Sequence, residues 1–522
     1  MGVGASSPQQ PAPGSAAAAS SGYDRDRLSI LAGTSQNVLG VTIALIATAI
    51  VNLLMSNRLG PEGFGVVTVV TQAAFVASFA TRAGMDMAIL REVAIDTGGG
   101  RSSHTGAKVA RAVLIAGLVS SFAAIVAVLA AGAIREVFSL DGVAGRRVVE
   151  AAALGLPFLA VTNVWLAATR GLKIMRYTLY VFWAGQPIVW IVLLLAGWAV
   201  SGVTAWASVL AYSLSWLLAA GAAWHLWRRA SGGWQKEPLE AGALSRLARY
   251  AGPRAPAALF SQLLFWADLF VLTRYASRSE VGIYAGVLRV GQVVVLFLTS
   301  VNLMFSPFVA DLHARGAIDR LDRLFKNLTR WTLAATLPAF LLLIVTPSSV
   351  LRVLGSEYSA GRTALLIVLV GQLVNIATGS VGFVLIMVGR TGWDLAVYSG
   401  ALVLSIGSTI VLAPRYGMEG AAMANAATFA ASNLVRLLLV KRFVGIQPYD
   451  RGYFRLLAPA GVGLLVMWGV HNLSEWSFLP DLAITGVAGG LAYLAAYAAV
   501  GLTTEERTGA RKLVETRLGK RV

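Results

Sequence analysis

The 522-residue sequence contains no cysteine, and only 13% of its residues are charged. Without cysteine, the chain has no disulfide bond, no thiol nucleophile and no cysteine-ligated metal. Globular proteins carry about 25% charged residues, so the low charge content argues against a soluble fold. Histidine is also scarce, and its four positions show no metal-ligand spacing: His104, His225, His313 and His471. We therefore expect no metal and no cofactor.

Sequence motifs for nucleotide binding and metal-dependent catalysis are missing as well. The chain has no GxxxxGK[ST] segment to hold ATP phosphates and no HExxH motif. The GGGR at 98–101 has no preceding strand and is interpreted as a flexible turn. The longest polar stretches, near 227–247 and 310–328, are too short for a catalytic domain. These absences predict a protein that is not an enzyme.

Hydrophobic residues, in contrast, make up 57% of the chain, and the mean hydropathy is +0.70. A helix needs roughly 20 apolar residues to cross the hydrocarbon core of a bilayer. Apolar segments of this length recur throughout the sequence and predict an all-α integral membrane protein with about 14 transmembrane helices. The segments are 33–56, 64–84, 110–133, 149–169, 177–199, 203–226, 251–273, 281–305, 330–350, 362–388, 393–413, 418–440, 454–472 and 481–502.

The positive charges predict how these helices are oriented. The net charge is +18, and about 30 of the 43 Lys and Arg residues fall on one side of the predicted membrane, against about nine on the other. Cytoplasmic loops carry this excess, so we expect a multi-pass plasma-membrane protein with both termini in the cytoplasm. The basic residues then face anionic lipid, and no nucleic acid is expected as a partner. Residues 1–22 lack the pattern of a signal peptide.

The sequence repeats itself at an offset of about 216 residues. GVAGRRVVEAAALG (142–155) resembles EYSAGRTALLIVLVG (357–371), and SNRLGPEGFGVV (56–67) resembles LTRYASRSEVGIYA (272–285). Each repeat holds six predicted spans, and because six is even we expect two parallel six-helix lobes around a central cavity. The predicted divisions are a cytoplasmic tail (1–30), an N-lobe (31–228), a cytoplasmic linker (229–246), a C-lobe (247–442), two C-terminal helices (443–502) and a basic cytoplasmic tail (503–522).

Three stretches carry a family resemblance: NRLGPEGFGVVTVV (57–70), ADLFVLTRYASRSEVGIYAGVLRVGQV (267–293) and GMEGAAMANA (417–426). They resemble the polysaccharide flippase family, in the superfamily that also contains the multidrug and toxic-compound extrusion transporters. The resemblance extends over residues 30–445 and the two further spans. Lipid II flippases form a sister branch, but their arginine-rich first helix is missing here, since segment 33–56 contains no Arg.

The resemblance implies a function and a set of partners. Members of the family move polyprenyl-diphosphate-linked oligosaccharides from the inner to the outer leaflet by alternating access of two lobes. The implied partners are this lipid-linked oligosaccharide, the lipid bilayer and polysaccharide assembly proteins. The diphosphate carries negative charge, and arginine binds phosphate through two parallel N–H groups. The resemblance therefore implies an arginine-containing cavity.

Arg289 is the first candidate for that role. It lies eight residues into the segment 281–305, about 12 Å from the outer end, so its side chain does not readily reach the membrane surface. Gln292 follows one helical turn later. A charge at such depth costs at least ~2.5 kcal/mol on insertion scales and needs a partner or a hydrated cavity. We interpret Arg289 as facing the cavity, with a structural ion pair to Asp268 as the alternative.

A second pair of charges lies in YAGPRAPAALFSQLLFWADLFVLTRY (250–275). Arg254, Ser261 and Asp268 are spaced by seven residues, so at ~100° per residue they share one side of a helix. Arg254 either lines the cavity or extends to the cytoplasmic interface. Asp268 is either the counter-ion of an arginine, with Arg289 the nearest deep one, or a site that couples transport to protons or cations. We favour the counter-ion.

The same segment contains Pro253 and Pro256. Each removes a backbone donor, so the residues predict a kink near the cytoplasmic end of this span, or simply its first turn.

Weaker candidates lie in the N-terminal half and at the helix ends. Arg82 and Arg436 fall near cytoplasmic ends, where they either reach the interface or surround the mouth of the cavity. Within the repeat, Asn52 matches Asp268, and Gln72 lies within one residue of matching Arg289. The candidate substrate-binding residues are Arg289, Arg254, Asp268, Arg82, Gln72, Gln292, Asn52 and Asn37.

Three other functions fit parts of the sequence. A drug or cation antiporter of the same fold is expected to have an acidic cavity, whereas the spans contain four arginines and one deep acid, Asp268. A polysaccharide polymerase or lipid-linked glycosyltransferase is expected to have a large outer loop, whereas the predicted outer loops are mostly short. An inert scaffold for a polysaccharide assembly complex has no need of buried charges.

Overall fold

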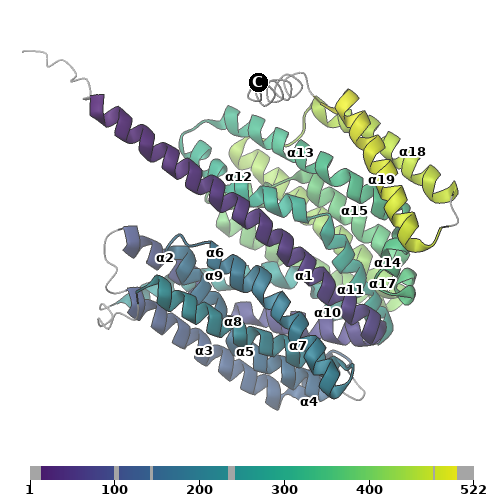
Figure 1. The fold of residues 1–522 in the computed structure, drawn as a ribbon, viewed down its shortest axis with the longest axis horizontal. Coiled ribbons are helices and arrows are strands. Elements are labelled where there is room, and N and C mark those ends of the chain that lie inside the picture. Colours follow the sequence, from purple (N-terminus) through teal and green to yellow (C-terminus); the bar gives the residue numbers. More distant parts are fainter. Residues whose placement is uncertain (1–12, 99–104, 141–144, 233–241, 474–475, 503–522) are drawn as a thin grey trace, which may run out of the picture.

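The computed structural model describes residues 13–98, 105–140, 145–232, 242–473 and 476–502. Within these ranges the secondary structure is helical, and no β-strand occurs. Ten of the described helices are long and apolar enough to cross a membrane. Figure 1 shows the long helices running in roughly one direction through the molecule. The predicted all-α membrane fold is therefore confirmed.

Two very long helices each turn sharply at a glycine. α1 (Pro13–Thr81) turns at Gly60, whose φ is 66°, and α17 (Thr391–Val444) turns at Gly417, whose φ is 54°. Glycine adopts this left-handed conformation at little cost, whereas a side chain would strain it. Each glycine therefore joins two helical arms without a loop, and each arm corresponds to one predicted span.

The other helices are joined by short connections. Before residue 231 they are α2 (Met85–Gly98), α3 (Thr105–Leu129), α4 (Ala131–Val137), α5 (Gly145–Gly171), α6 (Arg176–Thr178), the π-helix η2 (Leu179–Gly185), α7 (Gln186–Ser201) and α8 (Ala205–Ala230). After it they are α9 (Ala243–Leu264), α10 (Ala267–Leu272), α11 (Arg278–Val293), α12 (Leu296–Ala314), α13 (Ile318–Val345), α14 (Pro347–Arg352), η3 (Ser356–Gly361), α15 (Arg362–Thr378), α16 (Val381–Met387), η4 (Arg451–Leu456), α18 (Leu457–Leu473), α19 (Phe478–Ala496) and η5 (Tyr497–Gly501).

All fourteen predicted segments coincide with helical parts of the described chain, but their number as membrane spans stays a prediction. Several are built from two shorter helices. The predicted span 281–305, for example, consists of α11 and α12, with a break at residues 294–295. Such broken helices are tolerated in membranes where the freed backbone groups face protein or a cavity.

The alternative that the prolines form the first turn of the span was wrong, because α9 begins at Ala243, and a kink at the prolines stays a prediction. α9 continues through Pro253 and Pro256, and the span is interrupted at Phe265 and Trp266, before α10 begins. Trp266 has φ −132° and ψ −2°, which is not helical. This break also separates Arg254 from Asp268, so the two no longer belong to one continuous helix.

The helix contacts form two groups with α1 between them. In the N-terminal bundle, α5 packs against α3 and α8, and α8 packs against α7. In the C-terminal bundle, α17 packs against α10, α15 and α16. α1 contacts α5 and α8 of the first bundle and α9 and α11 of the second, and Figure 1 shows it lying diagonally across the molecule. The exact lobe limits remain predictions.

The two C-terminal helices α18 and α19 pack against each other and against α13. Figure 1 shows them on the outside of the C-terminal bundle. Polar contacts fix this position: the Tyr493 hydroxyl donates to the carbonyl of Ala334 at 2.8 Å, and the Ser349 hydroxyl donates to Asp481 at 2.7 Å. They therefore add to one bundle and take no part in the contact between the two.

The connections gather at two opposite ends of the molecule. We call one the hairpin end, defined by residues 57–63, 137–140, 353–361 and 414–418; it lies at the right in Figure 1, beyond α4 and α14. The other, the α2 end, lies at the left and contains α2 and α6. The charge distribution predicts that the hairpin end is extracytoplasmic.

Single cysteines test this orientation, because the natural chain has none. We expect Val137→Cys and Glu357→Cys, both at exposed positions of the hairpin end, to react with a membrane-impermeant maleimide in intact cells. Arg229→Cys, exposed at the other end, should react only after the membrane is permeabilised. The reverse pattern would invert the topology.

Candidate substrate-binding cavity

A cavity of about 420 Å3 lies between the two bundles. Both bundles contribute to its wall, α1, η2, α7 and α8 on one side and α9, α11, α15 and α17 on the other. Its lining combines aromatic rings, amide side chains and one arginine. The lining residues are Thr48, Gln72, Phe75, Phe182, Trp183, Gln186, Pro187, Trp190, Tyr212, Trp216, Gln262, Phe265, Trp266, Leu288, Arg289, Gln292, Val295, Val368, Gln372, Asn425 and Phe429.

Arg289 is the one charged residue among the described residues that line this cavity. It projects from α11, and its guanidinium carbon lies 4.7 Å from the ring centre of Trp266. Its Nε is buried without a hydrogen-bond partner, and no ion pair forms on Arg289 within the described part of the chain. A guanidinium has five N–H donors, so this arginine retains binding capacity for an anion.

Amide side chains surround the arginine. Gln72 and Gln292, both predicted candidates, line the cavity, which brings them together with Arg289 as expected from the repeat. Four further amides were not predicted: Gln186, Gln262, Gln372 and Asn425. Gln186 donates to the hydroxyl of Ser215 at 2.9 Å. Each amide offers both donors and acceptors, so the wall suits a neutral polyhydroxylated ligand as well as an anion.

Asp268 pairs with no arginine among the described side chains, Arg289 included, which corrects the favoured prediction. It is fully buried in α10, where its Oδ2 accepts hydrogen bonds from the Tyr284 hydroxyl and from Nδ2 of Asn425, the latter at 2.8 Å. Its Oδ1 has no partner among the described residues. The break at Phe265 and Trp266 explains the difference, because it directs Asp268 behind the cavity wall while Trp266 lines the cavity.

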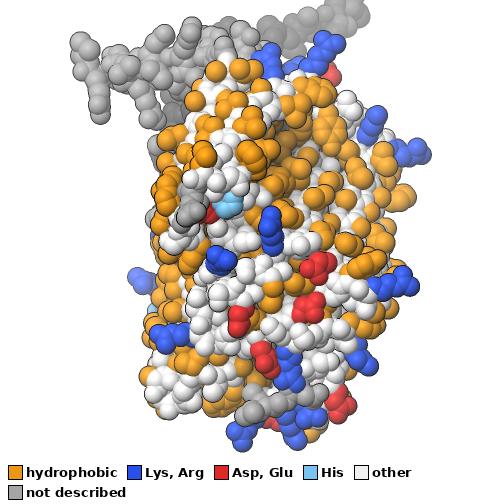
Figure 2. All heavy atoms as spheres, turned by 90° about the vertical axis from the view of Figure 1, so that its right-hand side faces the viewer, with side chains coloured by type: hydrophobic (Ala, Val, Ile, Leu, Met, Phe, Trp, Pro, Cys, Tyr) orange, Lys and Arg blue, Asp and Glu red, His pale blue; other side chains and the backbone are white. Residues whose placement is uncertain are grey.

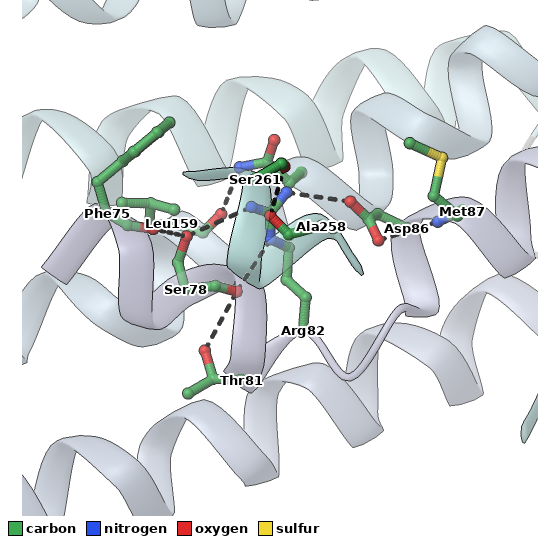
Figure 3. Close-up of polar contacts among 10 residues, drawn as sticks. Phe75, Ser78, Thr81, Arg82, Asp86, Met87, Leu159, Ala258 and Ser261 are labelled. Atoms are coloured by element: carbon green, nitrogen blue, oxygen red, sulfur yellow. Dashed lines mark hydrogen bonds and ion pairs between the residues drawn. The ribbon is translucent and has the colours of Figure 1, made fainter. Parts of the chain in front are cut away.

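Arg82 does not line the cavity either. It lies just after α1 and is 4% exposed; Nη1 contacts Oδ2 of Asp86 at 3.0 Å, and Nε donates to the carbonyl of Ser78 at 3.0 Å. Figure 3 draws this cluster with Ala258 and Ser261 of α9, a helix that contacts both α1 and α2. Arg82 thus links α1 to α2 within the protein.

The remaining predicted residues have more local environments. Asn52 is buried, donates to the carbonyl of Thr48 at 2.7 Å and is absent from the cavity lining. Arg436 is buried, with its Nε 3.4 Å from Asp394 and its guanidinium over the ring of Tyr398. Both therefore act inside the protein. The side chains of Arg254 and Asn37 lie outside the described residues.

The bundles meet tightly at the hairpin end. The Cβ of a side chain at Gly65 of α1 would lie 2.8 Å from the Cα of Gly282 of α11, and one at Gly282 would overlap the carbonyl oxygen of Pro61. Nearby, Arg278 contacts Glu62 at 3.2 Å across the two bundles. Figure 2 shows acidic and basic side chains together on this face of the molecule. The cavity is therefore closed toward the hairpin end by backbone-to-backbone contact.

Two further contacts join the bundles on either side of Gly60. Nδ2 of Asn57 donates to the carbonyl of Val353 at 3.1 Å, and the rings of Phe64 and Tyr358 meet edge to face at 6.0 Å. Within the C-terminal bundle, Glu280 in the first turn of α11 accepts from the backbone N–H of Met418 at 2.6 Å, just after the turn of α17.

Two helix bundles around a polar cavity, with α1 between them, define a membrane protein with the architecture of a transporter. Residues 30–313 match the family described as "Polysaccharide biosynthesis protein", more than half of the chain. The chain belongs to this family.

Individual relatives agree with this assignment. A curated protein from Haloferax volcanii, "Probable low-salt glycan biosynthesis flippase Agl15", is 23% identical over 217 residues, which are 40% of this chain and 46% of the relative. The chain thus aligns with about half of that relative's length.

Solved structures show the same fold. The lipid II flippase MurJ in an inward closed conformation superposes with a TM-score of 0.70 at 13% identity, covering 89% of this chain and 97% of MurJ. A multidrug resistance MATE family transporter of the MOP superfamily, in an inward-facing conformation, gives a TM-score of 0.64 at 12% identity, covering 78% of this chain and 98% of the transporter. At these identities the likeness concerns the fold alone.

Proposed function

We propose that this protein is a membrane flippase that moves a polyprenyl-diphosphate-linked oligosaccharide from the inner to the outer leaflet, and that it is a transporter, not an enzyme. The observation that carries the proposal is the single unpaired arginine in an otherwise uncharged polar cavity between two bundles. The family and the relative named a glycan biosynthesis flippase support it.

In this proposal Arg289 holds the diphosphate. An anion that enters a low-dielectric cavity must exchange its hydration for fixed donors, and a guanidinium supplies two of them in a planar, forked arrangement. Because no acidic residue of the described chain neutralises Arg289, its charge remains available to the substrate. Gln72 and Gln292 are proposed as neighbouring donors, and Arg254 and Asn37 as further contacts on the route into the cavity.

The proposed direction, from the inner to the outer leaflet, is compatible with a closed hairpin end that faces outward. With this end facing outward, the structure represents the state before release, in which the cavity is shut toward the outside. Substrate would enter from the inner leaflet, and rocking of the two bundles would separate Gly65 from Gly282. The lipid tail is proposed to stay in the bilayer, since in the cavity it would leave the charge of Arg289 without a partner.

The lining of the cavity argues against the alternative function, that of a cation antiporter. No Asp or Glu occurs among its described lining residues, and Arg289 would repel a cationic drug. The buried Asp268 accepts a hydrogen bond from the lining residue Asn425, but Tyr284 and Asn425 occupy its Oδ2. Anionic substrates are therefore favoured.

Reconstitution tests the proposed function. The purified protein is placed in vesicles that contain the polyprenyl-diphosphate glycan extracted from cells that naturally make this chain. We expect the glycan shielded in the inner leaflet to become accessible to an added lectin, at a rate that scales with protein content. Protein-free vesicles are the control, and ethidium uptake tests the antiporter. Accessibility equal to the control, or ethidium transport, would refute the flippase.

A further inference from the structure

The N-terminal side of the cavity is a continuous series of aromatic rings. The ring of Trp183 meets that of Phe182 at 5.2 Å, and Phe182 meets Trp216 at 5.5 Å. The series continues through Tyr212, which lies 6.2 Å from Trp216 and 4.9 Å from Trp190. All five residues line the cavity. We call these five residues the aromatic wall.

Local backbone structure places this wall. Phe182, Gln186 and Trp190 are spaced by four residues, which puts them on one helical face. The π-helix η2 contains Phe182 and Trp183, and its wider turn is found frequently at functional sites. Trp183 is 45% exposed although it lines the cavity, whereas Trp216 is only 3% exposed. Trp183 is therefore the most accessible of the five rings.

The opposite side of the cavity is rich in amides. Gln262, Gln292, Gln372 and Asn425 come from α9, α11, α15 and α17, and Arg289 lies among them. Aromatic rings opposite amides form an environment with two kinds of contact. A flat ring packs against the C–H face of a sugar, and amides exchange hydrogen bonds with its hydroxyl groups.

Other ligands use only part of this lining. A lipid tail would leave the buried Nε of Arg289 without a partner and would form no hydrogen bond with the amides. A bare diphosphate would use Arg289 and a few amides but would leave the aromatic wall unoccupied. A saccharide attached to a diphosphate uses the arginine, the amides and the rings together.

We propose that the aromatic wall binds the sugar residues of the substrate directly, with Trp183 as the main stacking ring, so that the cavity selects for the glycan and not only for the diphosphate. This inference rests on the proposed function, because it assumes that the lipid-linked glycan enters the cavity. It assigns the two sides different tasks: the arginine anchors charge, and the aromatic wall recognises the saccharide.

Binding to two lipids separates these tasks. The purified wild-type protein is titrated with the extracted polyprenyl-diphosphate glycan and with the same polyprenyl diphosphate without its glycan. We expect the glycan-bearing lipid to bind at least about tenfold more tightly, the effect of ~1.4 kcal/mol of added contact. In Trp183→Ala this advantage should disappear while binding of the bare diphosphate lipid changes less than about twofold.

The matched control is Trp468→Ala, which removes an exposed tryptophan of α18 outside the cavity lining and should keep the wild-type ratio. Melting temperatures of both variants check that they are folded. If wild-type protein binds the two lipids equally, or Trp183→Ala retains the glycan advantage, the inference is wrong and the flippase proposal is unaffected. If neither lipid binds the wild type, the proposed function fails, and the inference with it.

Discussion

Replacing Arg289 by alanine is expected to abolish export of the lipid-linked glycan while the protein still inserts and accumulates. Two charge-assisted hydrogen bonds to a diphosphate contribute roughly 3 kcal/mol or more, so affinity should fall at least about 100-fold. Accumulation should persist because no acid depends on Arg289 for neutralisation in the described chain. The variant loses the contact between the guanidinium and the ring of Trp266, which contributes about 0.5–2 kcal/mol to the stability of the protein.

Two further variants sharpen this test. Arg289→Lys should recover only part of the export, because an ammonium is a point charge without the planar fork. Arg274→Ala removes the same charge from an exposed position 15 residues earlier and should export normally. Export is measured as surface glycan at matched protein level, and wild-type export from Arg289→Ala would remove Arg289 from the substrate site.

The second large effect is expected at Asp268. In Asp268→Ala, the Tyr284 hydroxyl and the Asn425 amide lose their shared acceptor in a fully buried position. Each unsatisfied buried donor costs about 1–3 kcal/mol, so we expect a clear fall in melting temperature and protein level. Asp268→Asn keeps a carbonyl oxygen for both donors and should lose much less.

A double-mutant cycle distinguishes this role from that of a counter-ion. If Asp268 neutralised Arg289, Arg289→Gln would restore the stability lost in Asp268→Asn, because a lone buried charge is the costly state. The geometry instead predicts no coupling between Asp268 and Arg289 and measurable coupling between Asp268 and Tyr284 in the Tyr284→Phe background. Rescue by Arg289→Gln would show that the two charges interact. The response of Asp268→Asn to an imposed ion gradient tests ion coupling separately.

The membrane class of the protein and the position of Arg289 in a cavity were predictable, because charge and hydropathy are strong local signals. A charged residue in the middle of an apolar segment must meet a partner or a cavity, and the repeat pointed to Gln72 on the opposite lobe. The partner of Asp268 was not predictable in this way. The prediction took the nearest deep arginine in sequence as the partner, whereas the hydrogen bonds come from Tyr284 of α11 and from Asn425 of α17, 157 residues away.

The aromatic wall was missed for a different reason. In a membrane helix, tryptophan and phenylalanine occur both on surfaces that face lipid and on the walls of cavities. Composition therefore does not distinguish a lipid-facing surface from a cavity wall. The spacing of Phe182, Gln186 and Trp190 was the sequence pattern that indicated a cavity. A glutamine on the same helical face as two rings is unfavourable against lipid. The error at Arg82 has another origin. Its partner Asp86 lies nearby in sequence, but no simple sequence pattern predicts the turn at Ala83 and Gly84 that places α2 beside Arg82.

The contact between Gly65 and Gly282 makes the closed state depend on volume more than on charge. The accompanying ion pair of Glu62 and Arg278 is largely exposed and contributes at most about 1 kcal/mol. We therefore expect salt and pH to have little effect on the closure at the hairpin end. A single methyl group at position 282 would have a large effect on the closure. It would occupy the space of the Pro61 carbonyl and force the two bundles apart. The packing of the two bundles at the hairpin end thus requires that positions 65 and 282 carry no side chain.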